Sequence, residues 1–200
     1  MKAAGATKVV AAPPLDWNGR LLVMGGDASS TATMFDILGT FPANCPPTLV
    51  VQHLDPGLGE GMVAKLAENC AAKVVIAQDG MAIEQGTIYF APQGEHHMVV
   101  DAWPKGNIRL LARDPVAGER PSISLLFASA AKAGAANTAG VLLMAQGEDG
   151  TSGLKALLAS GSYAFSPALE GAGFTLAKGH VEQAVELANL PAAILKMCAK

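Results

Sequence analysis

The chain has 200 residues, of which 50% are hydrophobic and 5% aromatic, and a formal net charge of −3 at pH 7. This length and hydrophobic content fit one domain with a large core, and the apolar runs are far shorter than the roughly 20 residues of a membrane-spanning helix. Because lysine and arginine residues are scattered and aromatic residues are few, the composition argues against a nucleic-acid partner as well as against membrane insertion.

The N-terminal residues 1–18 include the stretch Ala11-Ala12-Pro13-Pro14, and we expect them to form a flexible tether ahead of a domain that spans residues 19–200. This stretch interrupts the continuous apolar core that a secretory signal needs. The cysteines lie far apart and form no Cys-x-x-Cys pair: Cys45, Cys70 and Cys198. The sequence therefore predicts a cytoplasmic protein with no disulfide framework, no metal site and no other cofactor.

Short runs of Val, Ile and Leu alternate along the chain with alanine-rich segments of helical period. This alternation is typical of parallel strands joined by crossover helices. In chain order, we expect strands near residues 20–25, 48–53, 73–77, 86–91, 139–145 and 162–166. We expect helices near residues 30–40, 58–70, 122–134, 151–160, 180–187 and 190–198.

The segment 96–112 interrupts this alternation, because two apolar runs flank the turn Pro104-Lys105-Gly106-Asn107. We expect a hairpin there, which would add a small antiparallel patch to the edge of an otherwise parallel sheet. The sequence thus predicts the α/β class: a mostly parallel, Rossmann-like central sheet flanked by helices on both faces, with a small antiparallel hairpin.

Three polar residues lie just past the ends of predicted strands. Asp27 follows the first strand and its Gly25-Gly26 turn, His53 follows the second strand, and Asp149 precedes the helix expected at 151–160. Because the carboxyl ends of parallel strands gather at one edge of a sheet, we expect these three side chains to converge. An acid, an imidazole and a further carboxylate could then meet at this edge.

The turn around Asp27 has the shape of a nucleophile elbow, in which a strand, a tight turn and a helix present one exposed side chain. Each residue also has a structural interpretation. Asp27 and Asp149 could simply cap the helices that follow them, and His53 could be a hydrogen-bonded residue without a catalytic role. Both interpretations stay open on the residues alone.

Several motifs, taken in order, resemble the catalytic domain of the chemotaxis protein-glutamate methylesterase (CheB) family over about residues 20–198. They are Leu49-Val50-Val51-Gln52-His53-Leu54, Gln78-Asp79-Gly80, Gly86-Thr87-Ile88-Tyr89-Phe90-Ala91-Pro92, Arg120-Pro121-Ser122-Ile123-Ser124-Leu125-Leu126-Phe127 and Gly147-Glu148-Asp149-Gly150. The resemblance implies the fold of the CheB C-terminal domain.

The resemblance also implies a Ser-His-Asp triad that hydrolyses glutamate γ-methyl esters on chemoreceptor helices and releases methanol. Carried over by position, His53 is the general base and Asp149 is its orienting carboxylate. The serine position of the family is occupied by Asp27.

Four further positions fall in the substrate and oxyanion region that the resemblance implies. They are Ala28 beside the elbow, Gln146 and Gly147 in the loop before Asp149, and His97 near the cleft. Gln146 stands where the family has methionine, so this loop departs from the family pattern.

A carboxylate at position 27 is a poor substitute for serine, because its attack on a carbonyl would give an anhydride and its charge would repel an oxyanion. We therefore expect a CheB-like domain with lost or reduced hydrolysis that acts in binding or regulation in a bacterial chemosensory pathway. Its partners would be chemoreceptor cytoplasmic helices or other chemosensory proteins.

Two alternatives remain. The first is an active protein-glutamate methylesterase that uses water or a displaced serine, although Ser29 and Ser30 are expected to lie on the helix and point elsewhere. The second takes Asp27 itself as a nucleophile at saturated carbon, as in dehalogenase-like and epoxide-hydrolase-like hydrolases.

Overall fold

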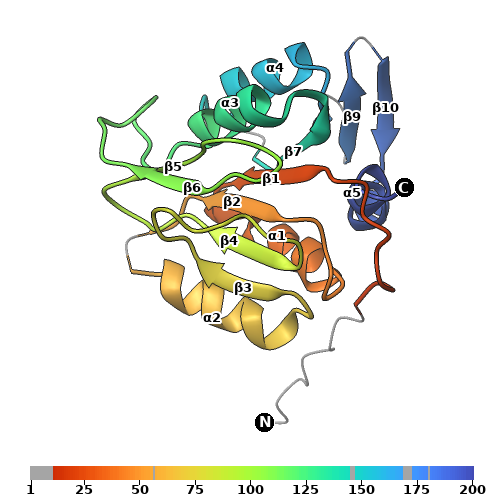
Figure 1. The fold of residues 1–200 in the computed structure, drawn as a ribbon, viewed down its shortest axis with the longest axis horizontal. Coiled ribbons are helices and arrows are strands. Elements are labelled where there is room, and N and C mark those ends of the chain that lie inside the picture. The colour runs from red at the N-terminus through yellow and green to blue at the C-terminus, as the bar shows by residue number, and fades with distance from the viewer. Residues whose placement is uncertain (1–10, 56, 145–146, 169–172, 180) are drawn as a thin grey trace.

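The computed structural model describes residues 11–55, 57–144, 147–168, 173–179 and 181–200. Its central feature is an eight-stranded sheet in the order β10-β9-β8-β7-β1-β2-β4-β3 (Figure 1). The strands are β1 (Leu21–Gly26), β2 (Thr48–Gln52), β3 (Lys73–Ile76), β4 (Thr87–Phe90), β7 (Thr138–Leu142), β8 (Tyr163–Pro167), β9 (Phe174–Lys178) and β10 (Val181–Val185). Neighbours from β3 through β8 pair in parallel, whereas β9 and β10 pair antiparallel. The predicted α/β class with a mostly parallel sheet is confirmed.

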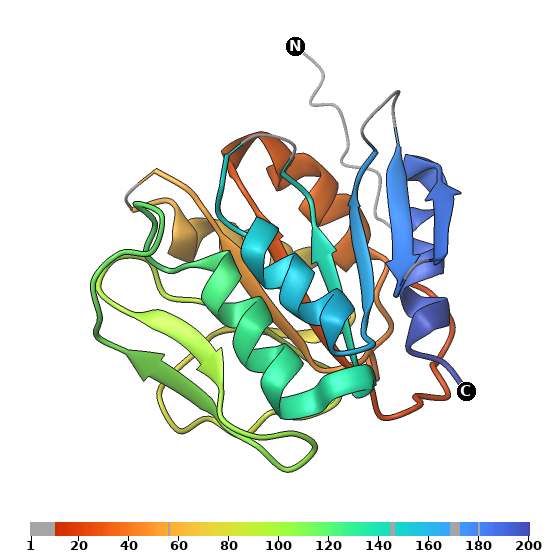
Figure 2. The same cartoon turned by 90° about the horizontal axis from the view of Figure 1, so that it is seen from above.

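Helices cover both faces of this sheet. They are α1 (Thr31–Gly39), α2 (Gly59–Asn69), α3 (Ile123–Gly134), α4 (Thr151–Ala159) and α5 (Leu190–Met197). Strand β1 shows how the core is divided, because successive side chains of a strand point to opposite faces. Leu22 and Met24 pack in one cluster with α1, α2 and α5. Leu21 and Val23 pack in a second cluster with α3 and α4, which lie side by side in Figure 2.

The segment around 96–112 does form a hairpin, but it stands apart from the central sheet. Strands β5 (His97–Val100) and β6 (Ile108–Leu111) make a separate two-stranded antiparallel sheet, and β5 packs against α3 (Figure 2). The antiparallel edge of the central sheet is instead formed by β9 and β10. The expectation that the hairpin edges the central sheet is therefore wrong.

The helix expected at 180–187 is also wrong, because this segment contains strand β10. Its apolar residues Val181, Ala184 and Val185 follow the spacing of a helix face, yet Val181 is 73% exposed and only Val185 is buried. Antiparallel pairing with β9 satisfies the backbone of the segment without burying an apolar stripe. Tertiary pairing has thus overridden the local pattern.

The described part of the expected tether is held against the domain. Ala12 donates a backbone hydrogen bond to Thr40, and the side chain of Asn18 donates to the Met197 carbonyl near the C-terminus. Residues 1–10 of the tether lie outside the described residues. Among the helices that are described, none is long and apolar enough to cross a membrane.

Candidate active site at the carboxyl edge of the sheet

Asp27 directly follows β1 and caps a short 3-10 turn, Ala28–Ser30, that leads into α1. Its Oδ1 accepts hydrogen bonds from the backbone N–H of Ser30 at 3.1 Å and from the hydroxyl of Ser29 at 2.7 Å. The Ser30 hydroxyl in turn accepts from the Asp27 N–H at 2.9 Å. The capping interpretation of Asp27 is thus observed. The expectation that Ser29 points elsewhere is wrong, because its hydroxyl points to the Asp27 carboxylate.

The turn at Asp27 is fixed by the residues on either side of it. A Cβ atom at Gly26 would lie 2.7 Å from the Gln52 Oε1 atom and would also collide with the Ser30 hydroxyl, so this position requires glycine. The Gln52 amide, at the end of β2, donates to the Asp27 carbonyl and to the Thr31 hydroxyl. The elbow is therefore braced from the neighbouring strand.

His53 lies beside this elbow because β1 and β2 pair in parallel, and its backbone N–H donates to the Gly26 carbonyl at 2.9 Å. The ring Nε2 atom is 3.1 Å from the Pro121 carbonyl oxygen and 3.3 Å from Asp149 Oδ2. Both partners are acceptors, so Nε2 carries a proton. The other ring nitrogen, Nδ1, lies 3.8 Å from Oε2 of Glu119.

Asp149 is buried, and hydrogen-bond donors surround its carboxylate. Oδ1 accepts from the Ser122 hydroxyl and the Ser124 N–H, each at 2.9 Å, and Oδ2 accepts from the Ile123 N–H at 2.7 Å. These donors belong to the start of α3, whose N-cap residue is Ser122. Asp149 therefore caps α3, and not α4, whose N-cap residue is Gly150. The carboxylate also neutralises the positive end of the α3 dipole.

His53 and Asp149 stabilise each other's charged form. Burial by itself raises the pKa of the Asp149 carboxyl, but hydrogen bonds from His53 and from the first residues of α3 outweigh it and lower the pKa to about 2. Burial likewise disfavours the His53 imidazolium, yet the hydrogen bond with Asp149 and the charges of Glu119 and Asp149 raise the pKa of His53 above its usual value. The pair favours an imidazolium beside a carboxylate.

The remaining predicted site residues are His97, Ala28, Gly147 and Gln146. His97 is fully buried, with Nδ1 accepting from the Ser122 N–H at 3.1 Å and Nε2 lying 3.0 Å from the Asp114 carbonyl oxygen. The buried His97 ring therefore contacts the site through the backbone N–H of Ser122. Ala28 and Gly147 are exposed at the same sheet edge. Gln146 lies outside the described residues.

This fold and site can be compared with known proteins. Residues 22–193 match the family model described as CheB methylesterase. The chain belongs to the CheB methylesterase family. It is also similar in structure to the CheB methylesterase catalytic domain of Thermotoga maritima, with a TM-score of 0.71 and 27% identity over 76% of this chain and 82% of that one.

Two curated relatives of this CheB-family chain are each named protein-glutamate methylesterase/protein-glutamine glutaminase. The protein of Agrobacterium fabrum is 38% identical over 68% of this chain and 38% of its own length. The protein of Rhodopseudomonas palustris, whose name adds that it is of the group 3 operon, is 31% identical over 88% of this chain and 50% of its own length. The chain thus spans between about two fifths and half of these relatives.

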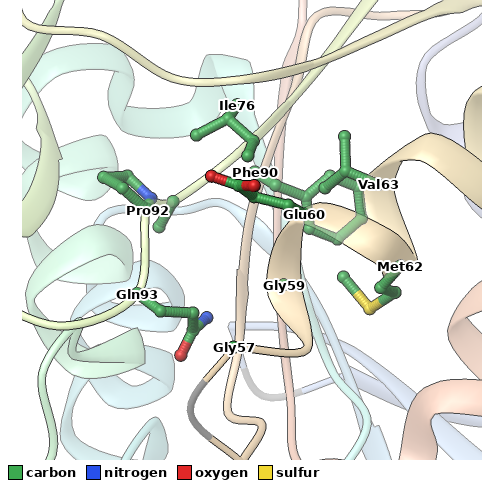
Figure 3. A pocket seen from close by; sticks show the side chains of 10 residues that line it. Gly57, Gly59, Glu60, Met62, Val63, Ile76, Phe90, Pro92 and Gln93 are labelled. Atoms are coloured by element: carbon green, nitrogen blue, oxygen red, sulfur yellow. The ribbon is translucent and has the colours of Figure 1, made fainter.

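A cleft of about 400 Å³ opens at the carboxyl edge of the sheet in this CheB-family domain. It lies between the start of α2 and the carboxyl ends of β3 and β4, and Figure 3 shows the Glu60 carboxylate beside Ile76 and Phe90 in its wall. Gln93 also lines the cleft and donates to the backbone carbonyl of Gln52 at 2.8 Å. The cleft therefore adjoins the brace that holds the elbow.

Sequence reasoning missed the residues that hold the two charged partners in place. Ser122 orients Asp149, Gln52 braces the elbow, and Glu119 faces the second ring nitrogen of His53, Nδ1. Ser122 stands before a helical segment, which is the signature of an N-cap. Glu119 carries no such signal, because it lies in a loop whose path the sequence pattern does not predict. Within the described part of the chain, no cluster of His, Cys, Asp and Glu suits a metal ion.

Proposed function

We propose that this CheB-family domain has lost or greatly reduced ester hydrolysis and acts in binding or regulation in a chemosensory pathway. The observation that carries the proposal is the residue at the elbow: Asp27 holds a carboxylate there and uses it to cap the following turn, directly after Gly26, whose carbonyl accepts from the His53 backbone N–H. In the family pattern this position holds the serine nucleophile. The contact between His53 Nε2 and Asp149 Oδ2, at 3.3 Å, supports the roles of base and orienting carboxylate that we propose for these two residues.

The charges around His53 support a loss of ester hydrolysis. Asp149 and Glu119 both lie within 4 Å of the ring, and Asp27 adds a third acidic residue on the neighbouring turn. An oxyanion that forms on an ester carbonyl needs hydrogen-bond donors or positive charge, and nearby carboxylates oppose it. Removal of the nucleophile from such a triad lowers kcat on the order of 10⁶-fold.

A role in binding is consistent with how firmly the site is built. The elbow is braced from β2 by Gln52, and Gln93 of the cleft donates a hydrogen bond to the backbone carbonyl of Gln52. We infer that the domain binds the substrates of its relatives, whose name refers to protein glutamate methyl esters, without efficiently hydrolysing them. The partners would be chemoreceptor cytoplasmic helices or other chemosensory proteins of the cytoplasm.

One observation favours an active methylesterase as a second candidate. The Ser29 hydroxyl is exposed and donates to Asp27 at 2.7 Å, so a carboxylate is placed to accept its proton. Ser29 would then be a displaced nucleophile. The structure offers less support for Asp27 itself as a nucleophile, because Oδ1 already accepts two hydrogen bonds and the adjoining cleft contains a carboxylate, Glu60.

The test is methanol release from a methylated chemoreceptor, measured for the parent chain, Asp27→Ser and Asp27→Ser/His53→Ala. We expect a silent parent, a gain in Asp27→Ser on the order of 100-fold or more, and loss of that gain in the double variant. If the parent releases methanol and Ser29→Ala abolishes that activity, the second candidate is established instead. Binding of the same receptor to the parent, measured by calorimetry, tests the binding role separately.

A further inference from the structure

The His53 ring has a carboxylate on each side. Nε2 lies 3.3 Å from Asp149 Oδ2, and Nδ1 lies 3.8 Å from Glu119 Oε2. The two partners differ in burial, because the Asp149 side chain is 1% exposed and that of Glu119 is 48% exposed. A Ser-His-Asp triad needs a carboxylate on one nitrogen only, and it needs the other nitrogen free to accept a proton. Glu119 faces the nitrogen that should be free.

Glu119 closes a tight turn of the backbone. Val116 and Glu119 exchange two backbone hydrogen bonds, at 3.1 and 3.0 Å, and so close a two-residue turn. The turn residues Ala117 and Gly118 both have positive φ, at 52° and 82°. This combination is that of a tight hairpin turn. Glu119 is therefore presented by a closed turn and not by an open loop.

Side chains on both sides of this turn attach it to the domain. Arg120 donates to the Gly94 carbonyl at 2.6 Å and to the Arg113 carbonyl at 3.1 Å. The buried His97 ring lies 3.0 Å from the Asp114 carbonyl oxygen. Because the same His97 ring also accepts from the N–H of Ser122 at the start of α3, the segment that carries Glu119 is connected to the segment that binds Asp149.

We propose that Glu119 is a positioning residue of this site, whose carboxylate holds the second nitrogen of His53 so that the ring is clamped as an imidazolium between two carboxylates. The clamp withholds from Nδ1 the lone pair that a general base needs. Glu119 thus restrains the base, just as Asp27 removes the nucleophile. Only the consequence for hydrolysis rests on the proposed function.

The proposal predicts that added salt weakens the effect of Glu119 on His53 more than the effect of Asp149. Asp149 is buried and screened little by added ions, whereas the half-exposed Glu119 interacts with the ring partly through solvent. Within the described residues, these two are the charged groups within 4 Å of the ring, and Asp27 is the acidic group on the adjoining turn. The contribution of Glu119 should therefore shrink as ionic strength rises, and that of Asp149 should persist.

The experiment is an NMR titration of His53 in the parent, in Glu119→Gln and in the control Glu68→Gln. Glu68 is exposed on α2, and its substitution removes the same charge away from the site. His53 signals are assigned from the spectrum of His53→Ala. We expect Glu119→Gln to lower the pKa of His53, Glu68→Gln to leave it unchanged, and the difference to narrow at high salt. An unchanged pKa in Glu119→Gln, with the rest of the spectrum intact, would overturn the clamp.

A second readout uses the Asp27→Ser background. If methanol release is restored there, adding Glu119→Gln should move the midpoint of its rise with pH toward lower pH, because the unprotonated ring becomes available earlier. A midpoint that stays in place while the rate changes would contradict the proposal. If Asp27→Ser stays inactive, Asp27 is not the cause of the lost hydrolysis in the proposed function, and the titration of the parent still decides the clamp.

Discussion

The two halves of the candidate site are built in different ways. The His53 and Asp149 half is embedded in the domain, since Asp149 is 3% exposed and accepts hydrogen bonds from residues that start α3. The Asp27 carboxylate, by contrast, accepts hydrogen bonds from residues two and three positions further along the chain. Replacing Asp149 should therefore destabilise the fold as well as the site. Replacing Asp27 should affect the fold much less. A domain built this way can change the residue at position 27 without losing its fold.

The largest expected effect comes from the embedded half. Asp149→Ala would leave the hydroxyl of Ser122 and the N–H groups of Ile123 and Ser124 buried without this acceptor. It would also leave His53 without its buried ion-pair partner. We expect a loss of about 3–5 kcal/mol in the free energy of unfolding. Urea unfolding followed by tryptophan fluorescence measures this loss. A loss under 1 kcal/mol would contradict the conclusion that the His53 and Asp149 half is embedded in the fold.

The same half should dominate the pH dependence of stability. The folded pKa of Asp149 is lowered to about 2, so its contribution is present above the unfolded pKa near 4 and is lost as the pH falls toward 2. His53 has a raised folded pKa, so its contribution is present below its unfolded pKa near 6.5 and is lost as the pH rises through the folded value.

We therefore expect the ion pair to contribute most between about pH 4 and 6.5. On acidification from pH 5 to 2, Asp149 should account for about 2 kcal/mol of the loss in stability. The measurement is the difference in unfolding free energy between the parent and Asp149→Asn across this range. A difference that does not vary with pH would show that the pair is not ionised as the geometry implies.

Much of this architecture is predictable from the sequence, and the exceptions share one cause. The β1, β2 and β7 strands were predicted because their apolar runs are continuous, and the positions of Asp27, His53 and Asp149 at one sheet edge follow from parallel pairing. The pattern of segment 180–187 indicates a helix, but antiparallel pairing of β10 with β9 decides its structure. Glu119 and Ser122 were missed because their partners lie far away in sequence. The features that could not be predicted are those that depend on long-range contacts, which local sequence patterns do not encode.

A smaller loss of stability is expected from a substitution at Gly26, between the two halves of the site. Gly26→Ala would bring a Cβ atom within 2.7 Å of Gln52 Oε1 and into the Ser30 hydroxyl, and both groups are held by hydrogen bonds to the elbow. We expect a loss of about 1–3 kcal/mol in unfolding free energy. Gly61→Ala is the matched control, because nothing lies within 4 Å of a Cβ atom at that position. Equal stability of the two variants would show that the elbow yields easily.

The smallest effect should come from Asp27 itself. Asp27→Ala removes the cap acceptor for the Ser30 N–H and should cost about 1 kcal/mol, whereas Asp27→Ser keeps an acceptor at the N-cap and should change stability by only a few tenths. Thermal unfolding of both variants beside Asp149→Ala provides the comparison. A loss from Asp27→Ser as large as that from Asp149→Ala would mean that the carboxylate at position 27 is itself a structural requirement. A near-neutral Asp27→Ser would mean that stability places no barrier between serine and aspartate there, so that function alone selects between them.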